Sequence, residues 1–326
     1  MQVTNTSNLN SGTMLSRVRS GGRGVWGIVT SNGKITFGVG VVLFFILVAI
    51  FAPLLTPYNP NAFMDVQSAP PSAAHWLGTT PRGEDVFSQL IYGTRASLLI
   101  GFIAAIGSTL LQVLFGTTSA YFGGFIDDFL SLIINIFLVL PGLPLAIVLA
   151  SFSPIKGSVL LAVILLFTSW SYGARVLRAQ TLSLKEREFV AAARASGESS
   201  TRLIFAEILP NEIALVVSNF VTTFVYTILA EVALEFLGLG DISHSSWGVI
   251  LFWAQSDNAL LGGEWWRFVP PGLCVAILCS GLTFINSGID ELANPRLRRE
   301  KPVQVARSLS ASPPATAEQH KEEVAQ

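Results

Sequence analysis

The sequence predicts an all-α, polytopic membrane protein with six transmembrane helices. Of its 326 residues, 51% are hydrophobic and only 13% are charged, and the mean hydropathy is +0.57. A soluble globular domain carries roughly 25% charged residues, so this chain has too few to cover a water-exposed surface of its size. The charges that it has lie mostly in segments between long apolar runs. These observations argue against an ordinary soluble domain.

Six runs without a charged residue approach the length of about 20 residues that a helix needs to cross the hydrocarbon core of a bilayer. In lipid each backbone amide must be hydrogen bonded within its own segment, so we expect helices rather than open strands. The runs span residues 37–55, 96–122, 129–155, 157–173, 213–230 and 268–289. The first follows 36 polar or glycine-rich residues and no convincing cleavage site, so we expect it to be a retained anchor.

The lysines and arginines indicate which segments face the cytoplasm, because cytoplasmic loops are enriched in them. Four lie in residues 1–36, six in residues 174–212 and six after residue 289, whereas four fall on the opposite side. Those four are Arg82, Arg95, Lys156 and Arg267. The sequence therefore predicts a multi-pass protein of the cell membrane, with both termini and the 174–212 loop in the cytoplasm.

The predicted organisation follows from these runs and charges. In order along the chain we expect a cytoplasmic tail (1–36), a first transmembrane helix (37–57), an extracytoplasmic segment (58–95), a five-helix core (96–290) that contains the 174–212 loop, and a cytoplasmic tail (291–326). From Pro302 onward the tail lacks apolar periodicity, so we expect it to be largely disordered.

No motif of a nucleotide-binding or catalytic protein is complete in this chain. Residues 27–35 are one residue too long for a phosphate-binding loop, and a G-x-G-x-x-G pattern at residues 22–27 has no preceding strand. His75, His244 and His320 lie far apart in the sequence. We therefore expect a non-catalytic chain that binds no cofactor, metal or nucleic acid.

The predicted cytoplasmic loop has the pattern of two short helices around a hinge. Residues 186–196 are rich in alanine and favour a helix, and Gly197 suits the left-handed conformation that ends one. Ser199 or Ser200 can cap a second helix, which is expected to stop before Pro210.

The first of these helices sorts its side chains by type. We expect an apolar face, a basic face and small residues between them, formed respectively by Phe189, Val190 and Ala193, by Arg187 and Arg194, and by Ala191 and Ala195. A small and basic surface beside a membrane suits docking into a cleft of a soluble partner. It also suits an amphipathic helix that rests on the lipid, and the residues alone leave both interpretations open.

One pattern in this loop distinguishes the two interpretations. It reads Ala191-Ala192-Ala193, then Gly197, then Leu209-Pro210. The pattern resembles E-A-A-x-x-x-G with a later Leu-Pro, which permeases of type I ABC importers use to contact their ATPases. Ala191 stands where that family has Glu, and Glu207 where His is common, so the resemblance supports the docking geometry more than its polar contacts.

Further stretches resemble the C-type permease subunits of dipeptide and oligopeptide importers. Residues 75–98 are similar to the start of their permease domain, although Thr80, Glu84 and Gln89 replace the Asp, Arg and Arg expected there. Residues 231–240, followed by Ser246-Trp247-Gly248, and residues 290–298 also match. Together the matches cover most of residues 37–298.

The resemblance implies a type I permease fold, with one N-terminal helix before a five-helix core. It implies three kinds of protein partner: a second, B-type permease subunit, two cytoplasmic ATPases that bind ATP and Mg²⁺, and an extracytoplasmic substrate-binding protein. It implies short peptides as substrate. It assigns ATPase coupling to Arg187, Phe189, Val190, Ala191, Ala192, Ala193, Arg194, Gly197, Leu209 and Pro210.

Two groups of residues are candidates for the pathway or its gate. Glu231 and Glu235 lie one turn apart at the outer end of the fifth run, where ionisable groups suggest function. We favour the simpler interpretation of solvation at the interface or a hydrogen bond to the other permease subunit. The break Pro141-Gly142-Leu143-Pro144 suits either a bend that lines the pathway or a packing kink.

Alternative functions follow from the same patterns. C-type subunits also serve nickel or other small solutes, and this chain does not encode the choice. An ion-coupled carrier or a membrane enzyme would need charges in mid-membrane or a buried nucleophile or metal set, and the runs offer neither.

Overall fold

The protein is described from a computed structural model, which describes residues 33–64 and 66–293. The chain divides into two compact units, residues 1–289 and 290–326, and the described part of the second is the end of the last helix. The predicted tails lie largely outside the described residues, as do residues 22–27 and His320.

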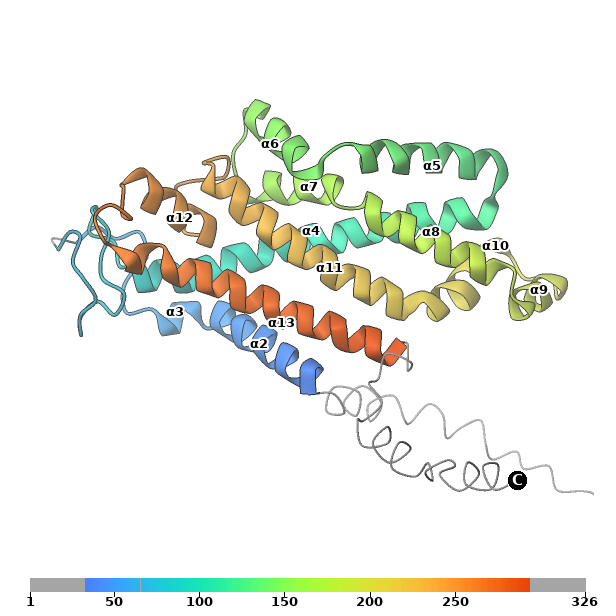
Figure 1. Ribbon diagram of the computed structural model, residues 1–326, viewed down its shortest axis with the longest axis horizontal. Helices are drawn as coiled ribbons and strands as arrows, with labels where there is room; N and C mark the ends of the chain where they lie inside the picture. The colour runs from blue at the N-terminus through green and yellow to red at the C-terminus, as the bar shows by residue number, and fades with distance from the viewer. Residues whose placement is uncertain (1–32, 65, 294–326) are drawn as a thin grey trace, which may run out of the picture. The chain divides into compact units, whose positions relative to one another are not determined.

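In order, the elements are α2 (Gly33–Ile50), α3 (Ala52–Leu55), α4 (Val86–Phe122), α5 (Gly124–Val139), α6 (Gly142–Phe152), α7 (Ser158–Thr168), α8 (Ser171–Lys185), α9 (Glu188–Ala195), α10 (Ser200–Arg202), the π-helix η2 (Leu203–Ile208), α11 (Leu209–Phe236), α12 (Trp247–Ser256), the 3-10 helix η3 (Trp265–Arg267) and α13 (Val269–Ala293) (Figure 1).

The predicted all-α class is confirmed. Five helices of the described residues are long and apolar enough to cross a membrane, and a sixth span is formed if α5 and α6 count as one bent pair. The bend between them is 83°. It falls at the predicted Pro141 to Pro144 break, because Leu140 and Pro141 are extended and Pro141 has no amide hydrogen with which to continue α5.

The second span begins ten residues earlier than the apolar run suggests. α4 starts at Val86 because Asp85 caps it, accepting hydrogen bonds from the amide of Ser88 at 2.8 Å and from its hydroxyl at 2.7 Å. The predicted outer segment therefore ends at residue 85, and Arg95 lies within the helix.

The expectation that the second loop helix stops before Pro210 is wrong. α10, η2 and α11 form one continuous span from Ser200 to Phe236. The amide of Leu209 donates to the carbonyl of Ile204, five residues back, and the side chain of Asn211 donates to the carbonyl of Glu207 at 2.6 Å. Wider π turns and a side-chain donor thus accommodate a proline that cannot donate.

Close contact between the helices depends on small residues. α4 packs against α7, α8 and α11. A Cβ at Gly116 would lie 2.5 Å from the carbonyl oxygen of Ala174 on α8, and one at Gly101 would lie 2.7 Å from Ile228 on α11. Since lipid provides no hydrophobic drive between helices, such close backbone approach is what allows dispersion forces to hold them together.

The N-terminal helix α2 packs on α13 by the same device. A Cβ at Gly38 would lie 2.4 Å from the carbonyl oxygen of Gly281, and one at Gly281 would lie 2.7 Å from Val41. The rings of Phe37 and Phe284 meet edge to face with their centroids 5.4 Å apart. First and last spans are therefore neighbours, as Figure 1 shows.

Candidate functional site

The helix α9 ends as its sequence predicts. Gly197 has a φ of +82°, and its amide donates to the carbonyl of Arg194 at 3.1 Å. The amide of Glu198 donates to the carbonyl of Ala193 at 3.3 Å. Ser199, one of the two predicted caps, then accepts a hydrogen bond from the amide of Arg202. The reversal between α9 and α10 is therefore held by backbone bonds that require a left-handed residue.

The apolar face of α9 is turned toward the chain itself. Val190 is fully buried, and Ala193 is half-buried beside it. They belong to an apolar cluster, called here the coupling cluster, whose buried members are Tyr121, Val190, Leu203, Ile204 and Ile208. This cluster joins α9 to the end of α4 and to η2, so α9 is fixed to two spans.

The opposite face of α9 is exposed and carries the small and basic residues. Arg187, Ala191, Ala192, Arg194 and Ala195 are all exposed, and so is Gly197 beyond the helix end. Phe189 was expected to share the apolar face, but it is 39% exposed and lies outside the coupling cluster. A helix that rests on lipid needs its apolar face free, whereas Val190 is covered by this protein. The small and basic face of α9 is therefore free for a partner, and docking stays a prediction.

Leu209 and Pro210 lie at the junction of η2 and α11, not on α9. Leu209 is half-buried and Pro210 is exposed. Their place in the fold is to direct the chain from the coupling cluster into the span α11.

Glu231 and Glu235 are not exposed to solvent, so the solvation at the interface that was expected from the sequence is wrong. Glu231 is fully buried and Glu235 is 3% exposed. The hydroxyl of Ser97 on α4 donates to Glu231 at 3.1 Å, and the hydroxyl of Ser246 donates to Glu235. The carboxylates bind this same chain because α4 and the loop before α12 bring hydroxyl groups to them.

The sequence reasoning missed Ser97, which links three elements. Its hydroxyl also accepts a hydrogen bond from the amide of Trp247 at 3.3 Å, and the Trp247 indole donates to the carbonyl of Leu90 at 3.3 Å. Gly248 packs directly on Glu235, where a Cβ would lie 2.6 Å from the Glu235 Cβ. The matched Ser246-Trp247-Gly248 stretch was the available signal, although it does not reveal Ser97.

Replacing Ser97 with alanine should destabilise the packing of α4, α11 and α12 where they meet at Glu231. The change leaves a buried carboxylate oxygen of Glu231 and the Trp247 amide without their partner, at a cost of about 1–3 kcal/mol. We expect a lower thermal unfolding midpoint in detergent. Ser280→Ala is the matched control, because that exposed hydroxyl bonds only the Ala276 carbonyl of its own helix. Equal midpoints for the two variants would contradict this role of Ser97.

At the predicted break between α5 and α6, Gly142 packs closely against Tyr226 of α11. Pro141 and Pro144 are exposed, and a Cβ at Gly142 would lie 2.8 Å from the Tyr226 hydroxyl. The structure thus shows a packing contact at the bend, and its role in lining the pathway stays a prediction. Among the described residues no group of three or more His, Cys, Asp or Glu could hold a metal ion.

Comparison with known proteins places this geometry in context. Residues 112–299 match the family of binding-protein-dependent transport system inner membrane components, and residues 26–71 match the N-terminal transmembrane domain of oligopeptide transport permease C. The dipeptide transport system permease protein DppC of Bacillus subtilis (strain 168) is 33% identical over 279 residues, which is 84% of this chain and 85% of that protein. The oligopeptide transport system permease protein OppC of the same organism is 32% identical over 273 residues, 82% of this chain and 88% of that protein. OppC of Mycobacterium bovis is 32% identical over 260 residues, 78% of this chain and 88% of that protein.

Proposed function

Because the chain belongs to the family of binding-protein-dependent transport system inner membrane components, we propose that it passes short peptides across the membrane and receives the energy for this through α9. It is a non-catalytic, multi-pass inner-membrane permease subunit of an ABC importer. Membership of this family implies an ATPase and a binding protein as partners. The peptide substrate is supported by relatives named for dipeptide and oligopeptide transport.

The observation that carries the proposal is the division of α9 into two faces. Val190 is fixed in the coupling cluster with Tyr121 of α4 and Ile208 of η2. Ala192 and Arg194 are exposed on the other side. A surface that is free for a partner on one side and packed against spans on the other can transmit a displacement, because packed interiors deform little.

The proposed assembly has four further subunits. A distinct B-type permease subunit pairs with this chain, and substrate passes between the two. Two cytoplasmic ATPases bind ATP and Mg²⁺, and one of them docks on α9. The binding protein delivers peptide on the other side, where the segment before α4 and the segment between α11 and α13 lie. In this orientation both termini are cytoplasmic, as the distribution of lysine and arginine supports.

Transport then follows from a population shift between two packed arrangements. Closure of the ATPases on ATP moves α9, and the coupling cluster carries α4 and α11 with it. ATP favours the outward-open arrangement only by binding it better than the inward-open one. The residues of this chain make no chemical step; they convert a docking contact into a movement of helices.

Photo-crosslinking in the complete transporter tests the docking contact. A benzophenone amino acid at the exposed Ala195 should capture an ATPase subunit, because that position lies on the free face of α9. The matched probe at Leu237, which is 54% exposed beyond the other end of α11, should capture none. If the Ala195 probe captures no ATPase, α9 is not the docking element.

Uptake in proteoliposomes tests the substrate. A labelled dipeptide or tetrapeptide should accumulate only when the binding protein is outside and ATP is inside. Uptake of nickel but of neither peptide, by the same complex, would overturn the proposed substrate class and leave the docking result intact.

A further inference from the structure

Arg95 differs from the other basic residues predicted on the outer side. Lys156 donates to the carbonyl of Ala150 at 2.6 Å. Arg82 lies 3.5 Å from Glu84 and 3.8 Å from the centre of a Trp253 ring. Arg267 is buried in ion pairs with Glu264 and Asp257. Arg95 is exposed and has no ion pair or hydrogen bond through its side chain within residues 33–64 and 66–293.

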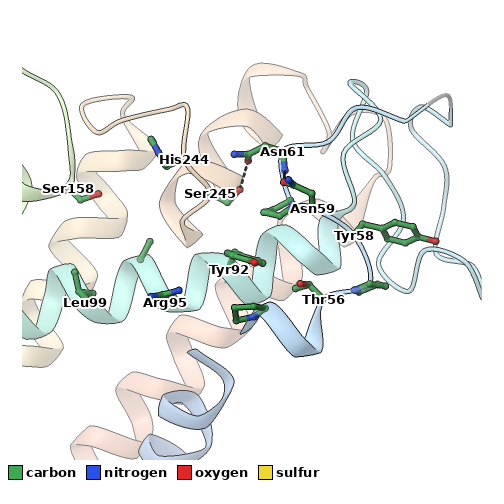
Figure 2. Close-up of a pocket in the computed structure, with 14 residues that line it drawn as sticks. Thr56, Tyr58, Asn59, Asn61, Tyr92, Arg95, Leu99, Ser158, His244 and Ser245 are labelled. Carbon is green, nitrogen blue, oxygen red and sulfur yellow. Dashed lines mark hydrogen bonds between the residues drawn. The ribbon is translucent and has the colours of Figure 1, made fainter. Parts of the chain in front are cut away.

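Arg95 lines a pocket of about 700 Å³. Figure 2 shows Tyr92, Arg95 and Leu99 along α4, with Asn59, Asn61 and Ser245 on one side of them. The hydroxyl of Ser245 donates to the side-chain oxygen of Asn61 at 3.4 Å, which joins the two loops that wall the pocket. Polar side chains from these two loops therefore line the pocket together with apolar ones, and the spanning helix α4 forms its floor.

Arg95 is the formally charged side chain among the described residues that line this pocket. His244 also lines it but lies 2.9 Å from Asp241. The Ser243 hydroxyl donates to Asp241 and lowers the pKa of that carboxyl, so Asp241 stays ionised near neutral pH. The Asp241 carboxylate therefore pairs with the His244 imidazole. The net attraction of the pocket is consequently for an anion, and Arg95 provides it.

The level of Arg95 in the membrane strengthens that attraction. The charge-free part of α4 begins at the next residue, Ala96. α4 has 37 residues, which is about 55 Å of helix against a hydrocarbon core of about 30 Å. Arg95 therefore lies near the outer boundary of the hydrocarbon, where the dielectric constant is below that of bulk water and an ion pair is correspondingly stronger.

We infer that the Arg95 pocket is an anion-binding site that receives the terminal carboxylate of a short peptide on its way into the permease. The planar guanidinium fits a carboxylate with two parallel hydrogen bonds. The hydroxyl of Tyr92 has no partner in the described part of the chain, and the Asn59 amide nitrogen is unused there, so both can bind peptide groups. The inference rests on the proposed peptide transport and assigns one recognition step to it.

A phospholipid phosphate offers the same charge to the same guanidinium, so the experiment must separate the two sources. Uptake by the complete transporter is measured in proteoliposomes with a peptide and its C-terminal amide, at concentrations that saturate the binding protein with either. The wild-type, Arg95→Gln and Lys156→Gln transporters are compared in neutral and in anionic lipids. Lys156→Gln removes the same charge from the same side without altering the pocket lining.

Arg95→Gln should lower uptake of the free-acid peptide about tenfold, which corresponds to one charge-assisted contact of about 1.4 kcal/mol. Uptake of the amide should be low in the wild type and unchanged by Arg95→Gln, and Lys156→Gln should alter neither. An equal loss for both peptides, or a loss only in anionic lipids, would assign Arg95 to a lipid phosphate and overturn the inference. Equal wild-type uptake of acid and amide would also overturn it, while peptide transport itself would stand. If the wild type imports neither peptide, the proposed peptide transport is wrong, and the inference about Arg95 falls with it.

Discussion

Replacing Ala192 with tryptophan should lower ATP-driven uptake at least about 100-fold. Ala192 is exposed in the middle of the free face of α9. A large ring there would hold a docked ATPase away from the helix, since tightly packed contact surfaces do not absorb added volume. The coupling cluster lies on the opposite face, so insertion and folding of the permease should be unaffected.

Three measurements distinguish loss of coupling from loss of protein. Uptake, ATP hydrolysis stimulated by the binding protein, and the amount of folded permease in the membrane are compared for Ala192→Trp and Ala192→Ser. The serine variant adds one oxygen atom and should transport normally. Ala193 is unsuitable for this test because it packs against the coupling cluster. Normal uptake by the tryptophan variant would remove α9 from the mechanism.

Replacing Gly38 with leucine should separate α2 from α13 and destabilise the permease by about 3 kcal/mol or more. The Cβ of any residue at this position would lie 2.4 Å from the carbonyl oxygen of Gly281 and 2.8 Å from Ile285. A backbone carbonyl cannot rotate away from this contact, so the whole helix must move. We expect a lower thermal midpoint in detergent and weaker maleimide cross-linking between cysteines introduced for Phe37 and Phe284.

The control for this change is two residues away on the same helix. Gly40 is exposed, and a Cβ there has nothing within 4 Å, so Gly40→Leu should be tolerated. Both changes add the same side chain to the same apolar helix. A similar loss of stability in both variants would show that helix propensity or insertion, rather than contact with α13, explains the effect.

The span α11 joins the two ends of the permease. At one end it continues from η2, which contributes Leu203, Ile204 and Ile208 to the coupling cluster. At the other end it carries Glu231 and Glu235, which hold Ser97 and Ser246. In the proposed mechanism, a displacement of α9 by an ATPase would have a continuous packed route through α11 to the loop that walls the Arg95 pocket. We expect the carboxylate pair to keep that loop attached to α11 during the movement.

Hydropathy predicted where the spans lie but not where their helices end. It detects the apolar part of a helix, whereas the helices continue beyond that part. α4 begins at a capping Asp85 before its apolar run, and α8 extends through Arg178, which binds Asp127 with two hydrogen bonds of 2.7 Å. The prediction that a helix stops before Pro210 was wrong for a related reason. A proline removes one local hydrogen bond, but the wider turns of η2 provide others, such as that from the Leu209 amide to the Ile204 carbonyl.

The sequence by itself determined the membrane class, the order of the apolar runs, the bend at Pro141 and the left-handed end of α9 at Gly197, because each depends on neighbouring residues or on average polarity. Only the tertiary structure decided that Val190 faces inward and that Glu231 binds Ser97 from 134 positions away. It also decided that Arg95 lacks, within residues 33–64 and 66–293, the kind of side-chain partner that Arg82, Lys156 and Arg267 have. Burial and pairing depend on which helices become neighbours. Which helices become neighbours depends in turn on small residues such as Gly38 and Gly116. At these positions the absence of a Cβ atom allows two backbones to approach closely.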